Sequence, residues 1–243
     1  MIVTSERREQ FDERGFFVLE SFFSVEEICD IATAIDSFAG DHDRRLRESG
    51  TQGISRPGEI AFTANLALKD PRIFAFCAQA KMVQLVTELI GPDVRLYWDQ
   101  SVYKHPETAR EFPWHQDNGY TPVIPAQYYT CWLALSDSTL ENGCIRVLPG
   151  SHMQGPVEHR DSPMGRVGYD GPDPGIPVPL KSGSMAVFSS LLLHKSGPNL
   201  TDSTRKAYII QYIPANACSG ATGEPFEDRK WIAQSGKPSR PNR

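Results

Sequence analysis

Apolar residues return at helical spacing in two stretches of the first third of the chain. Ser24 opens a Ser-x-x-Glu capping box, and apolar residues then recur every three or four positions as far as Gly40. Asp70 and Pro71 form an N-cap and first-turn pair for a second such stretch, which ends at Gly91. The pattern predicts one helix between Ser24 and Gly40 and another between Asp70 and Gly91.

From residue 94 onward the pattern changes to short runs of apolar, β-branched and aromatic residues, which are typical of strands. The runs are VRLYWDQSVYK (94–104), QYYTCWLALS (127–136), CIRVLP (144–149), MAVFSSLLLH (185–194) and AYIIQYIP (207–214). Strands in this number and order predict a sheet sandwich or barrel, with the N-terminal helices packed on it.

Two segments interrupt these patterns. Residues 40–59 are polar and contain glycine, which indicates a mobile loop, and residues 153–178 are crowded with Gly and Pro, which is typical of a lid or binding loop. We expect a single domain over 1–243, helix-rich over 1–92, with a β core over 93–214 and a flexible tail over 215–243.

Composition narrows the possible partners. The chain has 243 residues, of which 40% are hydrophobic, and its formal net charge of −5 offers no sustained basic surface for nucleic acid. No apolar run is long enough to span a membrane, the charged N-terminus lacks a signal peptide, and the five cysteines form no Cys-x-x-Cys pair. We expect a cytoplasmic monomer or homodimer with reduced thiols and a small-molecule partner.

The segment FPWHQDNGY at 112–120 places His115 and Asp117 two residues apart. On a strand, residues at this spacing point to the same face, so an imidazole and a carboxylate would converge. His194 ends the apolar run 185–194 and is the best candidate for a third ligand. Two histidines and one carboxylate form the facial triad of non-haem Fe(II) oxygenases, which leaves positions open for co-substrate and oxygen. Alone, His115 and Asp117 would be more simply explained as a surface pair.

Arg205 gives this interpretation further support. It follows His194 by eleven residues and stands at the start of the run RKAYIIQYIP. A guanidinium can bind a carboxylate with two parallel hydrogen bonds, which a lysine cannot match. A dicarboxylate such as 2-oxoglutarate would therefore chelate iron at one end and meet Arg205 at the other.

Three blocks of this sequence resemble the phytanoyl-CoA dioxygenase family of Fe(II)/2-oxoglutarate-dependent oxygenases. They are HQD at 115–117, ENGCIRVLPGSH at 141–152 and HKSGPNLTDSTR at 194–205. The resemblance extends from GFFVLESFFSVEEI near residue 15 to QYIP at 211–214. It implies a mainly β fold with flanking helices, in which the core over 93–214 is a double-stranded β-helix, the cupin-like jelly roll.

The resemblance also implies the roles of particular residues. His115, Asp117 and His194 would hold Fe(II), and Arg205 would bind the distal carboxylate of 2-oxoglutarate. Further co-substrate neighbours by the same match are Lys104, Gln116, Thr130, Trp132 and Ser196. Related halogenases replace the carboxylate ligand by a small residue, so the presence of Asp117 argues against halogenation.

The implied chemistry is oxidative decarboxylation of 2-oxoglutarate with O2, coupled to oxidation of a substrate C–H bond. Hydroxylation, cyclisation, desaturation and epimerisation are all open outcomes. Aromatic and apolar residues in the loops favour a bulky small molecule, and thus a tailoring step in natural product biosynthesis. Candidate substrate contacts are Phe112, Trp114, Met153, Met164, Val167 and Tyr169. For Phe112 and Trp114, core packing is an equally good explanation.

Alternatives remain at this stage. The second hypothesis is an acyl-CoA or other lipid hydroxylase, because an anionic acyl-CoA would suit Arg44, Arg45 and Arg47. Acidic neighbours nevertheless make a solvated charged segment the better explanation of these arginines. A zinc-dependent or non-catalytic jelly-roll ligand-binding protein is the third. His105, His152 and His159 lack comparable support for a metal role, and a structural hydrogen bond is favoured for His152.

Overall fold

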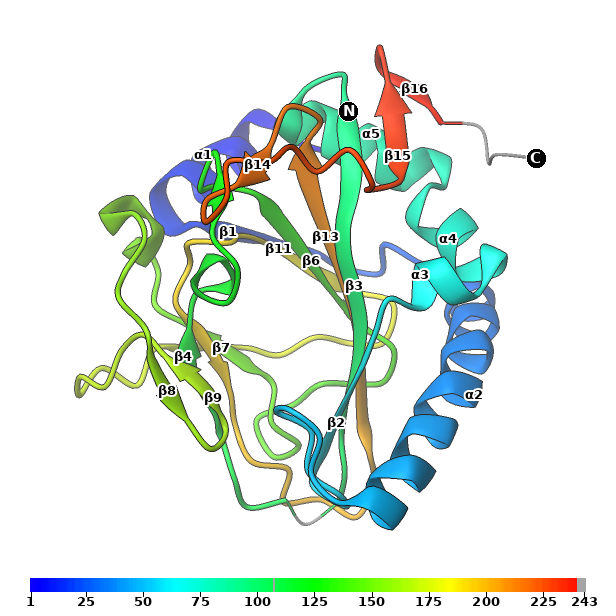
Figure 1. Ribbon diagram of the computed structural model, residues 1–243, viewed down its shortest axis with the longest axis vertical. Helices are drawn as coiled ribbons and strands as arrows, with labels where there is room; N and C mark the ends of the chain where they lie inside the picture. Colours follow the sequence, from blue (N-terminus) through cyan, green and yellow to red (C-terminus); the bar gives the residue numbers. More distant parts are fainter. Residues whose placement is uncertain (107, 240–243) are drawn as a thin grey trace.

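A computed structural model describes residues 1–106 and 108–239, and in these residues two antiparallel sheets face each other (Figure 1). The larger sheet has the order β1-β11-β6-β13-β3-β15-β16, with β2 also paired to β3, and the smaller has the order β10-β7-β12-β4. This arrangement of two opposed sheets confirms the predicted jelly roll.

The strands of the larger sheet are β1 (Phe16–Leu19), β2 (Ile60–Ala64), β3 (Val94–Lys104), β6 (Tyr129–Ala134), β11 (Met185–Ser189), β13 (Arg205–Pro214), β15 (Trp231–Gln234) and β16 (Lys237–Pro238). Those of the smaller sheet are β4 (Phe112–His115), β7 (Ile145–Val147), β10 (Ile176–Val178) and β12 (His194–Ser196). Two short ribbons pair β5 (Val123–Ile124) with β14 (Cys218–Ser219) and β8 (Arg160–Ser162) with β9 (Gly165–Val167).

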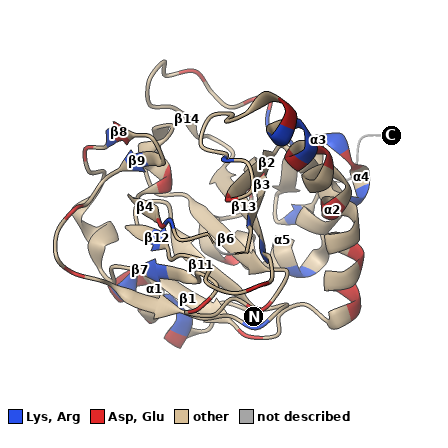
Figure 2. Cartoon of the chain, turned by 90° about the horizontal axis from the view of Figure 1, so that it is seen from below, with Lys and Arg blue, Asp and Glu red and all other residues tan. Residues whose placement is uncertain are grey.

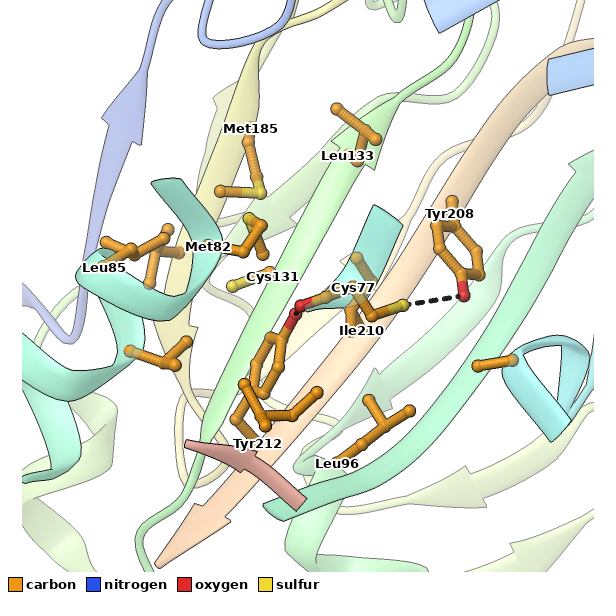
Figure 3. Close-up of a cluster of buried hydrophobic side chains, with 14 of the residues drawn as sticks. Cys77, Met82, Leu85, Leu96, Cys131, Leu133, Met185, Tyr208, Ile210 and Tyr212 are labelled. Atoms are coloured by element: carbon orange, nitrogen blue, oxygen red, sulfur yellow. Dashed lines mark hydrogen bonds between the residues drawn. The ribbon is translucent and has the colours of Figure 1, made fainter. Parts of the chain in front are cut away.

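The helices are α1 (Ser5–Arg14), α2 (Val25–Ser49), α3 (Leu66–Lys69), α4 (Pro71–Cys77) and α5 (Ala80–Ile90), with short 3-10 helices η1 (Asp117–Gly119) and η2 (Ser151–Gln154). Helices α2 to α5 lie along one side of the larger sheet (Figure 1). Their apolar faces and that side of the sheet form the main core. Figure 3 shows part of it, where the Cys77 and Tyr208 side chains approach to 3.3 Å and the Tyr212 hydroxyl donates to the Cys77 carbonyl. A second core fills the space between the sheets, so the site is built on a rigid frame.

Helix α2 begins as predicted, with Ser24 accepting from the Glu27 amide and Glu27 closing the capping box. Its predicted end at Gly40 is wrong, because the helix continues to Ser49 and is followed by Gly50 with φ of 82°. Glycine costs a helix only about 1 kcal/mol. That cost is offset here because Leu46 is fully buried. Residues 41–49 of the predicted mobile loop are therefore helix.

The second predicted helix begins at the expected N-cap, where Asp70 accepts from the Arg72 amide, and it ends at Gly91. It divides into α4 and α5, which meet at a 49° bend. In the described residues no single helix is long and apolar enough to cross a membrane, and only this bent pair reaches that length and composition together. Its apolar residues, including Phe74 and Val86, pack in the main core.

Strand β3 has the predicted bounds, whereas the run 185–194 divides into β11 of the larger sheet and the start of β12 in the smaller one. The N-terminal third also supplies β1 and β2, in addition to its helices. The expected tail over 215–243 differs as well, because β15 pairs with β3 and Ile232 within it is buried. Residues 240–243 of that tail lie outside the described residues.

Candidate metal centre

His115, Asp117 and His194 converge at the smaller sheet. Strands β4 and β12 are antiparallel neighbours in which His115 and His194 stand directly opposite each other, and their rings are 4.1 Å apart. The Asp117 Oδ1 atom lies 3.9 Å from Nε2 of His115 and 3.7 Å from Nε2 of His194. One potential ligand atom from each residue lies within 4.8 Å of the others, as a shared metal requires.

The route by which Asp117 reaches the site differs from the expectation. Strand β4 ends at His115, and Asp117 starts the 3-10 turn η1. The turn, not strand alternation, brings the carboxylate beside the imidazole. Its Oδ2 atom accepts a hydrogen bond of 2.5 Å from the Thr130 hydroxyl on β6, which leaves Oδ1 toward the histidines. The two sheets thus contribute together to the site.

Backbone carbonyls fix both imidazole rings. Nδ1 of His115 lies 2.8 Å from the Pro113 carbonyl oxygen, and Nδ1 of His194 lies 2.9 Å from that of Leu192. Because a carbonyl only accepts, each Nδ1 donates to it, and each Nε2 is left facing the site. Burial, followed by the neighbouring His194, holds the pKa of His115 well below its usual value, so this ring is neutral and ready to bind a cation.

A narrow cavity of about 60 Å³, here called the Arg205 cavity, opens from the triad between the sheets. The Arg205 side chain is fully buried, and its Nε and Nη2 atoms have no hydrogen-bond partner among the residues that the structure describes. Its guanidinium stands 5.3 Å from the centre of the Trp132 ring. Burial lowers the pKa of Arg205 to about 10, so it stays charged at neutral pH. A buried, charged guanidinium with N–H donors left free can bind an anion, which would accept hydrogen bonds from those donors.

Lys104 lies beside Arg205 but is not among the residues that line the Arg205 cavity. It is opposite Arg205 in the β3–β13 ladder and is almost fully buried. Its ammonium donates to the Ser196 hydroxyl at 3.1 Å and to the Gly197 carbonyl, and Ser196 itself lines the Arg205 cavity. Burial, followed by the proximity of Arg205, lowers the pKa of Lys104 to about 7.

A larger cavity of about 320 Å³, here called the aromatic cavity, is also lined by His115 and Asp117. Its lining comprises Ile54, Phe62, Tyr97, Trp98, Gln100, Phe112, His115, Asp117, Tyr120, Thr121, Tyr128 and Gln211. Five of these residues also line the Arg205 cavity: Phe62, Gln100, Phe112, His115 and Asp117. Two compartments of different chemistry therefore meet at the triad.

Not all of the predicted co-substrate neighbours line the Arg205 cavity. Thr130, Trp132 and Ser196 line the Arg205 cavity. Gln116 does not, because its position between the two ligands turns its side chain away from the triad. The Gln116 amide group donates to the Leu191 carbonyl at 2.7 Å and to the Gly155 carbonyl at 2.9 Å.

Of the predicted substrate contacts, Phe112 lines both cavities, and the remaining five are not among the residues that line either one. Trp114 packs against Tyr169 with ring centres 6.1 Å apart. Met153 is exposed, and Met164 contacts the core between the sheets. Val167 lies on β9.

Sequence reasoning missed most of the aromatic cavity. Trp98 and Gln100 lie two residues apart on β3, and the Trp98 indole donates to the Gln100 side chain at 3.2 Å. Because residues 94–104 were predicted as a strand, the alternation of side chains along it could have shown that Trp98 and Gln100 lie on the same face. Tyr120 follows the turn η1, where no periodicity marks it, and Tyr128 precedes β6 within the predicted run 127–136.

His152 has the structural role favoured for it. Its ring lies against Phe11, and its Nε2 atom donates to the Asp12 carbonyl at 3.2 Å, so it ties η2 to α1. The Nε2 atom of His105 lies 3.2 Å from Oδ1 of Asp43 of α2. Neither residue lines the two cavities.

Comparison with known proteins places this site in context. Residues 11–207 match the model of the family described as phytanoyl-CoA dioxygenase (PhyH). The peroxisomal phytanoyl-CoA dioxygenase of Rattus norvegicus is 25% identical over 239 residues, which cover 87% of this chain and 68% of the rat protein.

Solved structures share the fold. The non-haem alpha ketoglutarate-dependent carbocyclase SnoK from nogalamycin biosynthesis superposes with a TM-score of 0.73 at 22% identity, covering 92% of this chain and 93% of SnoK. The epimerase SnoN, in complex with Fe3+, alpha ketoglutarate and nogalamycin RO, has a TM-score of 0.73 at 20% identity, covering 93% of this chain and 97% of SnoN.

Proposed function

The chain belongs to the phytanoyl-CoA dioxygenase family and is an Fe(II)/2-oxoglutarate-dependent dioxygenase, and we propose that it oxidises a C–H bond of a bulky, uncharged small molecule. The observation that carries the proposal is the junction of two unlike cavities at His115 and Asp117. The Arg205 cavity contains a buried guanidinium, and the aromatic cavity is lined largely by aromatic side chains.

The residues present fit iron. Two imidazoles and one carboxylate form the donor set of the facial triad, in which the remaining coordination positions stay open. Each donor is oriented by a hydrogen bond from or to a neighbour, as in the Thr130–Asp117 pair. We therefore assign iron to His115, Asp117 and His194.

The residues present also fit 2-oxoglutarate. The unpartnered Nε and Nη2 atoms of Arg205 lie in a cavity that begins at the triad, so a dicarboxylate can reach from the metal to the guanidinium. Ser196, held by Lys104, adds a hydroxyl to the same cavity. We assign the distal carboxylate of 2-oxoglutarate to Arg205 and Ser196.

Bound iron and 2-oxoglutarate supply the oxidising chemistry, in which the 2-oxo acid is converted to succinate and CO2 while O2 is consumed. The chain's own residues orient and seal the reaction. His115 and His194 hold their Nε2 atoms toward the metal, and Thr130 restrains the Asp117 carboxylate. Trp132 and Arg205 line the Arg205 cavity, and the aromatic cavity borders the same His115 and Asp117 side chains.

The aromatic cavity supports an uncharged, ring-bearing substrate. Six of its lining residues carry aromatic rings other than imidazole, and none of its described residues is Lys or Arg. Aromatic walls bind flat apolar molecules through stacking and burial, and the amides of Gln100 and Gln211 offer hydrogen bonds. SnoK and SnoN are both described as enzymes from nogalamycin biosynthesis, which supports a tailoring step on a natural product.

An acyl-CoA or other lipid substrate receives less support. The phosphates of CoA require cationic partners, and two of the three arginines that the sequence offered for them form ion pairs on the surface of α2. Arg44 pairs with Asp41, and Arg47 pairs with Asp43 at 3.0 Å. Figure 2 shows basic and acidic residues interspersed along the chain without a gathered basic face in that view.

Succinate production by the Fe(II)-loaded enzyme tests the proposal. Uncharged polycyclic aromatic polyketides should raise 2-oxoglutarate turnover by about tenfold or more over the substrate-free rate, whereas acyl-CoA thioesters should not. Trp98→Ala should reduce this stimulation, and Leu140→Ala, at an exposed site, should not. Stimulation by acyl-CoA alone would overturn the substrate assignment. Product mass distinguishes hydroxylation, which adds one oxygen, from cyclisation or desaturation, which removes two hydrogens, and from epimerisation, which leaves the mass unchanged.

A further inference from the structure

His159 lies outside both cavities, yet both nitrogens of its ring are engaged next to the metal ligands. Its Nδ1 atom lies 2.9 Å from the Val157 carbonyl oxygen, and its Nε2 atom accepts from the backbone amide of Gln116 at 2.9 Å. Gln116 is the residue between His115 and Asp117. The His159 ring therefore holds the peptide that joins two of the three metal ligands.

Two glycines form the slot that receives this ring. A Cβ atom at Gly119 would lie 2.3 Å from Cε1 of His159, and one at Gly168 would lie 2.6 Å from Nε2. Neither glycine has φ in the left-handed region, so the backbone does not require glycine at these positions. The absence of a side chain there is explained by the His159 ring.

The side chain of Gln116 adds a second connection to the same segment. Its Oε1 atom accepts from the Val157 amide at 2.9 Å, and its Nε2 atom donates to the Gly155 carbonyl at 2.9 Å. Further along, the Gly168 amide donates to the Trp114 carbonyl at 2.8 Å. Residues 155–168 thus wrap around the ligand-bearing segment 114–119 through hydrogen bonds on both sides of the metal ligands.

We propose that His159 is a positioning residue whose ring, seated between Gly119 and Gly168, fixes the Gln116 peptide and so sets the spacing of His115 and Asp117 for iron. Through the same contact, residues 155–168 are held over the site. The inference rests on the iron site assigned above and is independent of the substrate proposal. His159 acts through the Gln116 peptide and does not itself bind the metal.

Hydrogen exchange of the metal-free protein and Co(II) titration together test this role. In His159→Ala the Gln116 amide loses its acceptor, so its exchange and that of residues 155–168 should accelerate by about tenfold or more. The Co(II) dissociation constant should rise by about tenfold to a hundredfold, the range typical of groups that orient metal ligands. His159→Gln keeps an acceptor near the Nε2 position and should restore most of the affinity. Glu158→Ala, at an exposed neighbour in the same segment, should match the wild type.

The two glycines provide a second, independent approach. Gly119→Ala and Gly168→Ala should each weaken Co(II) binding by pushing the ring out of its slot from opposite sides. In the His159→Ala background neither change should weaken binding further, because the ring that they displace is gone. If His159→Ala proves unstable, the single glycine variants still decide the question.

Two results would overturn the proposal: Co(II) affinity within twofold of the wild type in folded His159→Ala, Gly119→Ala and Gly168→Ala proteins, or unchanged exchange of the Gln116 amide without the ring. Co(II) binding and amide exchange require neither 2-oxoglutarate nor substrate. Their outcome is therefore distinguishable from a failure of the proposed substrate class.

Discussion

At the scale of residues, one local arrangement recurs at each histidine around the metal. His115, His159 and His194 each place Nδ1 within 2.9 Å of the carbonyl oxygen two residues earlier, which directs Nε2 outward. The Nε2 atoms of His115 and His194 face the metal site, whereas Nε2 of His159 accepts from the backbone amide of Gln116. The sequence predicted that His115 and Asp117 lie close together because the His-x-Asp spacing is local, but it could not predict that Gln116 points away, since that depends on the turn after β4.

Arg205 illustrates a conflict between stability and binding. Its buried guanidinium has two unpartnered nitrogens, and an uncompensated buried charge costs several kcal/mol. Arg205→Met should therefore raise the free energy of unfolding of the metal-free, 2-oxoglutarate-free protein by about 1 kcal/mol or more. Urea denaturation in the presence of a chelator measures this. Lys206→Met, which removes an ion pair with Asp36 on the opposite face of β13, should give no gain. A loss of stability in Arg205→Met would contradict the assignment.

The lowered pKa of Lys104 predicts a pH dependence of co-substrate binding. With a pKa of about 7, this lysine is charged below pH 7 and increasingly neutral above it. The carboxylates of 2-oxoglutarate are ionised throughout this range and favour the charged lysine, so affinity should fall as pH rises from 7 to 9. Isothermal titration of the Co(II)-loaded protein with 2-oxoglutarate at several pH values measures this. Lys104→Met should flatten the profile, and an equal slope in that variant would assign the effect to another group.

At the scale of elements, local signals determined which predictions succeeded. Strand β3 and the start of α2 were predicted because alternation and a capping box are encoded nearby. The run 185–194 was read as one strand, because apolar composition does not reveal the turn that passes the chain from one sheet to the other. Strand β15 was missed because its pairing with β3 joins segments far apart in sequence.

Helix α2 beyond Gly40 provides a direct test at this scale. Leu46 is fully buried in this extension. Leu46→Ala should lower the free energy of unfolding by about 2–5 kcal/mol, as expected for a large-to-small change in a core. Leu140→Ala, at a residue 59% exposed, should change it by about 0.5 kcal/mol or less. If Leu46→Ala were equally mild, residues 41–49 would not form a packed helix in solution.

At the scale of the whole molecule, the two sheets divide the interior into compartments with separate tasks. The smaller sheet supplies both histidines, and the larger sheet supplies Thr130, Trp132 and Arg205. The Arg205 cavity and the aromatic cavity share His115 and Asp117 in their lining, so the proposed sites of co-substrate and substrate adjoin at these two residues. Composition could not show this division, because it arises from strands that are distant in sequence and face each other in the fold.

The most direct test of this account is anaerobic titration of the purified protein with Fe(II) and 2-oxoglutarate, following the weak visible charge-transfer band of a chelated 2-oxo acid. The band should appear in the wild type and in Trp98→Ala, whose change lies in the aromatic cavity. Asp117→Ala should lose it, and Arg205→Met should need about tenfold to a hundredfold more 2-oxoglutarate, since hydrogen bonds to charged groups contribute about 1.5–3 kcal/mol. If folded wild-type protein gave no band, or if Arg205→Met bound 2-oxoglutarate normally, the assignment of the triad and its Arg205 cavity would be contradicted.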